Sequence, residues 1–267
     1  EGMMLVGAIA GFAVTVVTHN PWLGVLGAAA GGAAASMLFA VLVLQLNSNQ
    51  VATGLALTIF GTGLSSLLGL GFTGRIVMPF GSVFPVWLAK DPFWKLIFGY
   101  SPIVYFAIAM VPLVAWFLRS TRAGLILRAV GENDLSAHSI GYSVRGVRYA
   151  AIAFGGAMAG IGGCYFSMVI TPMWAEKMTA GRGWIALALV VFAGWRIGRL
   201  LSGAYFFGIL MALELYAKAS GFAFLPSQFW AAMPYLMTVV ALSFISSRGT
   251  AGSNAPACLG RPFLPST

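Results

Sequence analysis

Eight apolar stretches, separated mostly by short polar segments, leave few folds open to this sequence. They cover Met3–Thr18, Pro21–Leu46, Val51–Phe72, Ser101–Leu118, Tyr149–Ile170, Trp184–Gly194, Leu201–Ala217 and Trp230–Ser246. A helix that crosses a bilayer needs about 20 predominantly apolar residues, and most of these stretches approach that length. The pattern therefore predicts an all-α polytopic transmembrane helical bundle, treated as one domain over residues 1–267. The first and sixth stretches are short for full crossings and indicate discontinuous helices.

The balance of charged and apolar residues supports the same fold class. Only 8% of the residues are charged, whereas 60% are hydrophobic. A soluble domain carries about a quarter charged residues, so this chain has too few charges to cover a water-facing surface. Small residues also recur at every fourth position, which lets helix backbones pack closely. These positions are Gly27 and Gly31, Gly155, Ala159 and Gly163, and Gly156 and Gly160.

The chain lacks the residues that several classes of protein function require. The net charge of +9 could suggest nucleic acid, but the basic residues are spread along the chain and do not alternate with aromatic residues. Cys164 lies in an apolar stretch and Cys258 in the tail, which predicts neither a disulfide framework nor a metal site, and the two histidines are far apart in the sequence. The phosphate-binding motif Gly-x-x-x-x-Gly-Lys-[Ser/Thr] is absent from the sequence, as is His-Glu-x-x-His. We therefore expect a non-catalytic chain that binds no cofactor or metal ion.

The distribution of arginine predicts which side of the membrane each connection faces. Residues 119–148 carry Arg119, Arg122, Arg128, Arg145 and Arg148, which favours the cytoplasmic side. Alternating crossings then place the tail, residues 247–267, on the cytoplasmic side and residues 73–100 outside. The outer segment mixes aromatic residues, prolines and charges, as is typical of a segment lying in the headgroup layer. A docking surface for an external partner is compatible with that interpretation.

The segment Arg119–Arg148 has more internal pattern than a minimal turn between membrane helices. Ala123–Val130 reads as a short helix that Gly131 breaks. A second short helix, Leu135–Ile140, can be capped by Asn133 or Asp134 through a side-chain oxygen.

Gly141 is expected to end this second helix. The result would be a small helix lying across the cytoplasmic face that presents Glu132, Asp134, Ser136 and His138 to a partner. A solvated, positively charged loop is the competing interpretation from the residues alone.

Four sequence blocks carry a resemblance to a known family. They are EGMMLVGA from Glu1, NQVATGLALTIFGTGLSS from Asn49, AVGENDLSAHSIGYSVRGVRYAAIAFGGAMAGIGG from Ala129, and APACLGRPF from Ala255. Together they resemble the permease subunits of ABC importers of the ribose and branched-chain amino acid superfamily. The likeness is closest to the simple-sugar and nucleoside permeases that work with basic-membrane-protein-type lipoproteins. In that family EGMM follows further sequence, so additional N-terminal spans are expected before Glu1.

The resemblance implies a function and a set of partners. The chain would translocate nucleosides or simple sugars across a bacterial inner membrane, with its C-terminus in the cytoplasm. Its partners would be an ABC ATPase that holds ATP and Mg²⁺, a second permease (paralogous or identical) and an extracytoplasmic substrate-binding lipoprotein, with no nucleic acid. Branched-chain amino acids are a more distant alternative substrate. A secondary transporter is the rival class, although the apolar stretches contain few of the ionisable residues that ion coupling requires.

Within the resemblance, the helix at residues 131–141 is the expected contact with the ATPase. The coupling residues predicted on this basis are Gly131, Glu132, Asn133, Asp134, Ala137, His138, Ile140 and Gly141. We expect Glu132 and Asp134 to pair with basic groups on the ATPase. Ala137 and Ile140 would form the packed face.

Polar residues within the apolar stretches or at their ends are the candidates for a substrate path, because burial in lipid disfavours them unless they serve a purpose. They are Asn49, Gln50, Thr53, Thr58 and Glu214. Hydrogen bonding between helices is an alternative role for the first four. For Glu214 the alternative is an ion pair with Lys218, one helical turn further on.

Overall fold

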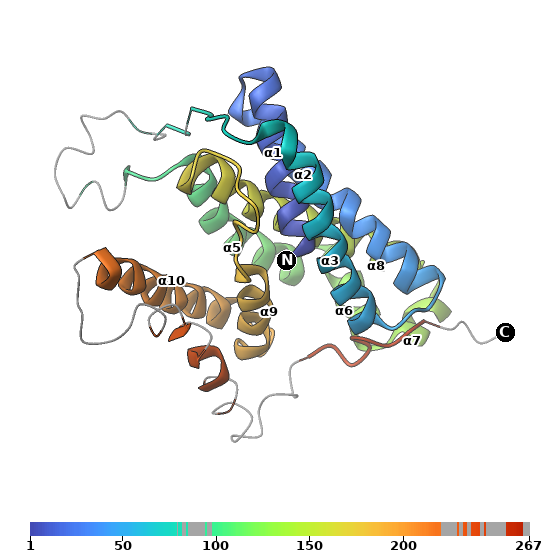
Figure 1. The fold of residues 1–267 in the computed structure, drawn as a ribbon. Helices are drawn as coiled ribbons and strands as arrows, with labels where there is room; N and C mark the ends of the chain where they lie inside the picture. Colours follow the sequence, from blue (N-terminus) through green and yellow to red (C-terminus); the bar gives the residue numbers. More distant parts are fainter. Residues whose placement is uncertain are drawn as a thin grey trace. The chain divides into compact units, whose positions relative to one another are not determined.

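The computed structural model describes residues 1–78, 80–81, 84, 94, 98–219, 229, 232–233, 236–240, 243 and 255–263. They belong to two compact units, Glu1–Ala180 with Cys258–Thr267, and Gly181–Ala257. The first unit contains α1 (Gly2–Thr18), α2 (Pro21–Ala40), α3 (Gln50–Gly69), α5 (Pro102–Ser120), α6 (Arg122–Glu132), α7 (Asp134–Ser139) and α8 (Val144–Tyr165), and the second contains α9 (Arg182–Phe192) and α10 (Ile197–Ala219) (Figure 1). Three single turns extend these helices: η1 (Val41–Gln45) and η4 (Phe166–Ile170) are π-helical and η2 (Leu70–Phe72) is 3₁₀.

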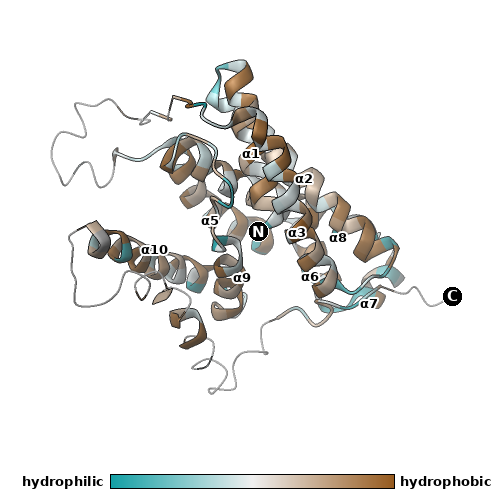
Figure 2. Ribbon diagram, in the orientation of Figure 1, coloured by the Kyte–Doolittle hydropathy of each residue, from teal (hydrophilic) through white to brown (hydrophobic). Residues whose placement is uncertain are grey.

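The predicted all-α fold is confirmed within the described residues. Five of their helices are long and apolar enough to cross a membrane, namely Pro21–Gln45, Gln50–Phe72, Pro102–Ser120, Val144–Ile170 and Ile197–Ala217. Figure 2 shows apolar residues along the length of these helices, and polar residues mainly near their ends and in the connections. The only β-type pairing in this part of the chain is an isolated bridge between Ile76 and Met173.

The two stretches predicted to be short are indeed short. Helix α1 has 17 residues and α9 has 11, both below the length of a full crossing. The predicted stretch Trp230–Ser246 lies mostly outside the described residues, as does most of the segment at residues 73–100. The assignment of the connections to the two sides of the membrane stays a prediction.

Helices α1, α2 and α8 pack against one another and form the centre of the first unit. Gly7 of α1 lies against Gly160, and Thr15, two turns later, hydrogen-bonds Met168 of the following π-helical turn, so α1 runs parallel to α8. Helix α2 runs the opposite way, because Gly31 lies against Ala10 and Gly24 against Thr15. Gly27 lies against Val14 of α1 in the same way, so the predicted packing role of Gly27 and Gly31 is confirmed.

The glycines of α8 that pack against other helices come from both of the predicted rows of small residues. A methyl group at Gly156 would overlap Ser36, and one at Gly160 would overlap the carbonyl oxygen of Ala28. Gly163 is equally close to α1, but a side chain at Gly155 would meet open space. The face that packs within this chain therefore contains Gly156, Gly160 and Gly163, and Gly155 is not part of it.

Helix α3 packs on α1 through a row of residues spaced one turn apart. Its buried residues are Thr53, Leu57, Gly61, Ser65 and Gly69, and Gly61 lies against the backbone of Gly2. The opposite side of α3 exposes large apolar side chains, including Ile59 and Leu67. Such a surface is unsuited to water, and it is compatible with contact to lipid or to another membrane subunit.

Candidate functional site

The connection between α5 and α8 folds into two short helices that meet at Asn133. Helix α6 begins after Thr121, whose hydroxyl accepts a hydrogen bond from the amide of Gly124 at 3.0 Å. It continues through Gly131 to Glu132, so the prediction that Gly131 breaks the helix was wrong. A single glycine costs a helix only about 1 kcal/mol, and other contacts easily offset that cost.

The end of α6 and the start of α7 are set by the extended backbone of Asn133. The side-chain oxygen of Asn133 accepts a hydrogen bond from the amide of Ser136 at 3.0 Å. Of the two predicted capping residues, Asn133 is therefore the one that caps α7. Gly141 follows the helix with a φ of 96°, a conformation that glycine adopts without strain, and its amide donates to the carbonyl of His138 at 2.8 Å. The predicted end of the helix is confirmed.

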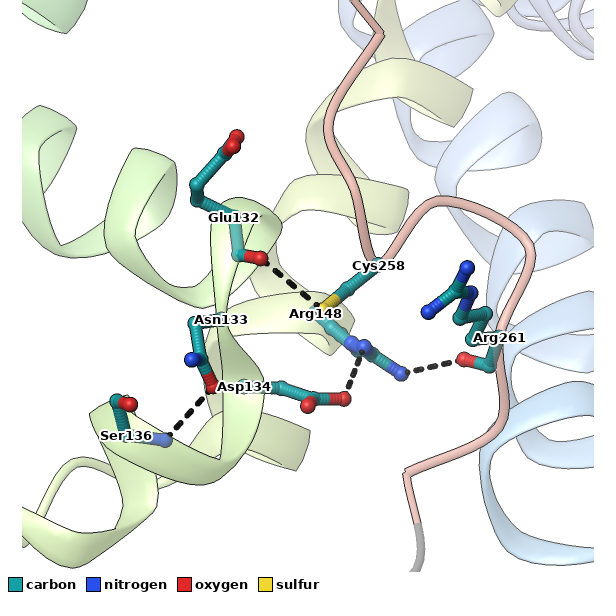
Figure 3. A network of polar contacts seen from close by, with 7 residues as sticks. All are labelled: Glu132, Asn133, Asp134, Ser136, Arg148, Cys258 and Arg261. Atoms are coloured by element: carbon teal, nitrogen blue, oxygen red, sulfur yellow. Dashed lines mark hydrogen bonds and ion pairs between the residues drawn. The ribbon is translucent and has the colours of Figure 1, made fainter.

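An ion pair joins α7 to the beginning of α8. The guanidinium Nη2 of Arg148 lies 2.9 Å from Oδ2 of Asp134, and the two side chains are only 15% and 14% exposed. The other terminal nitrogen of Arg148, Nη1, donates to the carbonyl oxygen of Arg261 at 3.0 Å. One guanidinium thus contacts α7 and a residue 113 positions later in the sequence, as Figure 3 shows.

Residues of the tail, Cys258–Phe263, lie directly against the two short helices. The amide of Cys258 donates to the carbonyl of Gly131 at 2.9 Å, and its thiol lies 3.4 Å from the carbonyl of Glu132 (Figure 3). Phe263 is buried with Val130, Ala137 and Val144, which come from α6, α7 and α8. The edge-to-face contact between Phe263 and the ring of His138 adds to this cluster, with centroids 5.4 Å apart.

Three of the predicted substrate-path residues form hydrogen bonds with the backbone at the start of α3. Asn49 caps α3 by accepting from the amides of Val51 and Ala52. The Thr53 hydroxyl donates to the carbonyl of Asn49 and contacts Ser48, and Thr58 donates to Gly54.

Gln50 and Glu214 are the remaining candidates for the substrate path. Gln50 is a partly exposed residue of the first turn of α3. Glu214 lies in α10, in the other unit, and its predicted partner Lys218 has a side chain outside the described part of the structure. Asn49, Gln50, Thr53 and Thr58 thus lie together at the start of α3 in the first unit, Glu214 lies in the second, and their role in a substrate path stays a prediction.

Four buried side-chain polar atoms within the described residues have no hydrogen-bond partner, those of Ser65, Ser101, Tyr149 and Trp174, and the sequence reasoning predicted none of them. Ser65 and Trp174 are both buried residues. Trp174 packs against Gly69, one turn beyond Ser65 on the same face of α3. The four-residue spacing of Leu57, Gly61, Ser65 and Gly69 could have indicated Ser65, but no local signal points to Trp174.

Residues 1–242 match the family model described as branched-chain amino acid transport system / permease component. The chain belongs to this permease family. No solved structure matches the permease.

Relatives of this permease carry the names of ABC transporter subunits. It is 40% identical to the putative glucose ABC transporter permease protein of Haloferax volcanii, over 91% of this chain and 81% of the relative. It is 29% identical to the guanosine ABC transporter permease protein of Bacillus subtilis, over 99% and 86% of the two chains. It is also 29% identical to the nucleoside ABC transporter permease protein of Lactococcus lactis subsp. cremoris, over 94% and 83%. The predicted family resemblance is confirmed.

The permease uses some of its predicted coupling residues internally and leaves others exposed. Asp134 is held by Arg148 and so is not available to pair with another protein in this arrangement. Ala137, only 2% exposed, packs inside the cluster with Phe263 and cannot serve as an outward packed face.

Three other predicted residues face outward. The Glu132 side chain points away from the ion pair (Figure 3), and both Glu132 and His138 are exposed, while Ile140 is 75% exposed.

Proposed function

We propose that this permease is the non-catalytic, membrane-spanning subunit of an ABC importer that carries simple sugars or nucleosides. The observation that carries the proposal is that α7 is fastened to α8 by an ion pair, while Ile140, directly after α7, is exposed. Leu135, Ile140 and Tyr142 are all exposed, and three large exposed side chains within eight residues fit a protein–protein contact better than a solvated loop. The ABC transporter names of the relatives support the same reading.

Energy would enter through this contact, because the chain has no phosphate-binding motif of its own. ATP and Mg²⁺ would be held by the partner ATPase, and the residues of the permease would neither hydrolyse nor bind nucleotide. A short helix attached to a membrane helix can pass on a rigid-body displacement, which a mobile loop cannot do as well. Glu132, His138 and Ile140 are the residues that would meet the ATPase.

The other partners follow from the apolar surface and from the charge pattern. Exposed apolar residues on α3 would face lipid or a second permease, either a paralogue or another copy of this chain. The arginines of residues 119–148 would hold α6, α7 and the tail on the cytoplasmic side of the inner membrane. Residues 73–100 would then lie on the outer side, where a substrate-binding lipoprotein would deliver the substrate.

The substrate is proposed from the relatives. Glucose is named for the relative with 40% identity, and guanosine and nucleosides for the two with 29% identity. These compounds share a polyhydroxylated ring, a hexose or a ribose. Branched-chain amino acids, which the family description names, have no such ring and are the less favoured alternative.

Uptake by the complete importer in proteoliposomes tests the proposal. The permease would be reconstituted with its ATPase, its second permease and its binding protein, and given radiolabelled glucose, guanosine or leucine. We expect uptake of glucose or guanosine that requires ATP on the ATPase side and persists when ionophores collapse ion gradients. Uptake that needs an ion gradient and no ATP would instead establish a secondary transporter, and uptake of leucine alone would overturn the substrate assignment.

A further inference from the structure

Three segments far apart in the sequence converge on the side chain of Arg148. Its two terminal nitrogens contact the carboxylate of Asp134 and the carbonyl of Arg261 separately, at 2.9 and 3.0 Å. The backbone of Arg148 belongs to α8, which packs in turn against α1 and α2. A single planar group therefore connects α7, the tail and a helix at the centre of the first unit.

The chemistry of this contact requires a guanidinium. Arginine presents several N–H donors in a fixed fork, whereas the ammonium of lysine is a compact point charge. Two acceptors on different segments can be held at the same time by the fork. A lysine at position 148 would keep the positive charge but could not be expected to hold both acceptors in the same geometry.

The position of α7 depends on these contacts more than on its own helical propensity. Six residues make less than two turns, and an isolated helix of that length is not stable in water. Besides the Asn133 cap, α7 is held by the Asp134 ion pair and by the burial of Ala137 against Val144 and Phe263. Phe263 belongs to the tail, so removing the tail would uncover one side of this cluster.

We propose that Arg148 is a positioning residue for energy coupling and that the tail, Cys258–Phe263, forms part of the coupling site. The tail and the guanidinium hold α7 to α8, so that a displacement of α7 by the ATPase moves α8 with it. This inference rests on the proposed function. It extends that function to a segment separated from α7 by more than 100 residues, for which the resemblance implied no role.

Two matched pairs of variants in the complete importer test the inference. Arg148→Lys is compared with Arg145→Lys, because Arg145 lies three residues earlier in α8, is exposed and makes no hydrogen bond or ion pair within the described residues. A chain that stops after Ala257 is compared with one that stops after Phe263. The readout is the number of substrate molecules imported per ATP hydrolysed, measured with assembly of the complex and its melting temperature.

Arg148→Lys and the stop after Ala257 should each lower this ratio by about fivefold or more, the lower end of the range in which coupling between two sites falls. Assembly should persist, with ATP hydrolysis continuing while import declines. The control variants should stay within about twofold of the unchanged importer, below that same range. A merely structural role would lower both activities together and leave the ratio unchanged.

The possible outcomes separate this inference from the proposed function. If the unchanged importer takes up neither a sugar nor a nucleoside, the proposed function fails and the ratio has no meaning. If the unchanged importer works and both test variants retain its ratio, the inference is overturned while the proposed function stands. Should the stop after Ala257 prevent assembly, Arg148→Lys alone decides the question, since it alters one side chain and conserves its charge.

Discussion

Arg148 and Asp134 form an ion pair at 2.9 Å that fastens α7 to the first turns of α8. Both side chains are largely buried, so each has lost most of its contact with water. The loss of one partner would leave the other charge buried and unpaired, which costs more than the ion pair itself contributes. The attachment of α7 is therefore sensitive to either residue.

Replacing Asp134 with alanine should loosen α7 and destabilise the protein. A hydrogen bond to a charged group contributes about 1.5–3 kcal/mol, and we expect a loss of that order. Hydrogen–deuterium exchange of the amides at residues 134–142 should accelerate, with a lower melting temperature in detergent. Glu132→Ala is the matched control, because that carboxylate is exposed and pairs with no described residue. Equal exchange in both variants would contradict the role given to the ion pair.

The cap on α7 makes a separate prediction. Asn133→Ala removes the acceptor for the Ser136 amide and should cost about 1 kcal/mol. Asn133→Asp keeps an equivalent oxygen and should leave stability nearly unchanged. Exchange of the Ser136 amide would report the difference, and protection retained in the alanine variant would show that the cap is not needed.

Two glycines five residues apart in α8 should respond in opposite ways to a methyl group. At Gly160 the added methyl would overlap the carbonyl oxygen of Ala28, and overpacking of this kind costs about 1–3 kcal/mol or more. At Gly155 it would meet open space, so the higher helix propensity of alanine should leave stability equal or slightly raised. Thermal unfolding of Gly160→Ala and Gly155→Ala in the same detergent measures both. Similar melting temperatures for the two variants would contradict the packing of α8 on α2.

This pair of glycines also shows where sequence reasoning reached its limit. Four-residue spacing revealed that α8 has faces made of small residues, but neighbouring positions on a helix point about 100° apart. Two such faces were therefore available, and the spacing could not decide which of them packs. Only the positions of α1 and α2 select Gly156 and Gly160 over Gly155.

Local sequence signals predicted the start and end of α7 better than they predicted its contacts with distant residues. The capping oxygen of Asn133 and the positive φ of Gly141 act within a few residues, so the start and end of α7 could be expected from the sequence. The contacts of Arg148 with Arg261 and of Cys258 with Gly131 join residues more than 100 positions apart. No periodicity encodes such pairings, and hence the internal use of Asp134 and Ala137 was not foreseen.

The buried hydroxyl of Ser65 gives a further test. Because it has no partner among the described residues, it contributes a desolvation cost without a compensating hydrogen bond. Ser65→Ala should therefore keep or raise the melting temperature of the isolated permease. Ser36→Ala is the comparison, since the buried hydroxyl of Ser36 donates to the carbonyl of Ala33 at 2.8 Å. A clear loss of stability in Ser65→Ala alone would mean that this hydroxyl has a partner in the folded protein.

The most direct test of the account is to identify the neighbour of α7 in the assembled importer. A photo-crosslinking amino acid at Ile140, which is 75% exposed, would be compared with the same group at Met78, which is 89% exposed and lies in the segment predicted to face outside. The account predicts that position 140 crosslinks to the ATPase and that position 78 does not. A crosslink from position 140 to the binding protein, or none to the ATPase in an importer that is actively transporting, would contradict it.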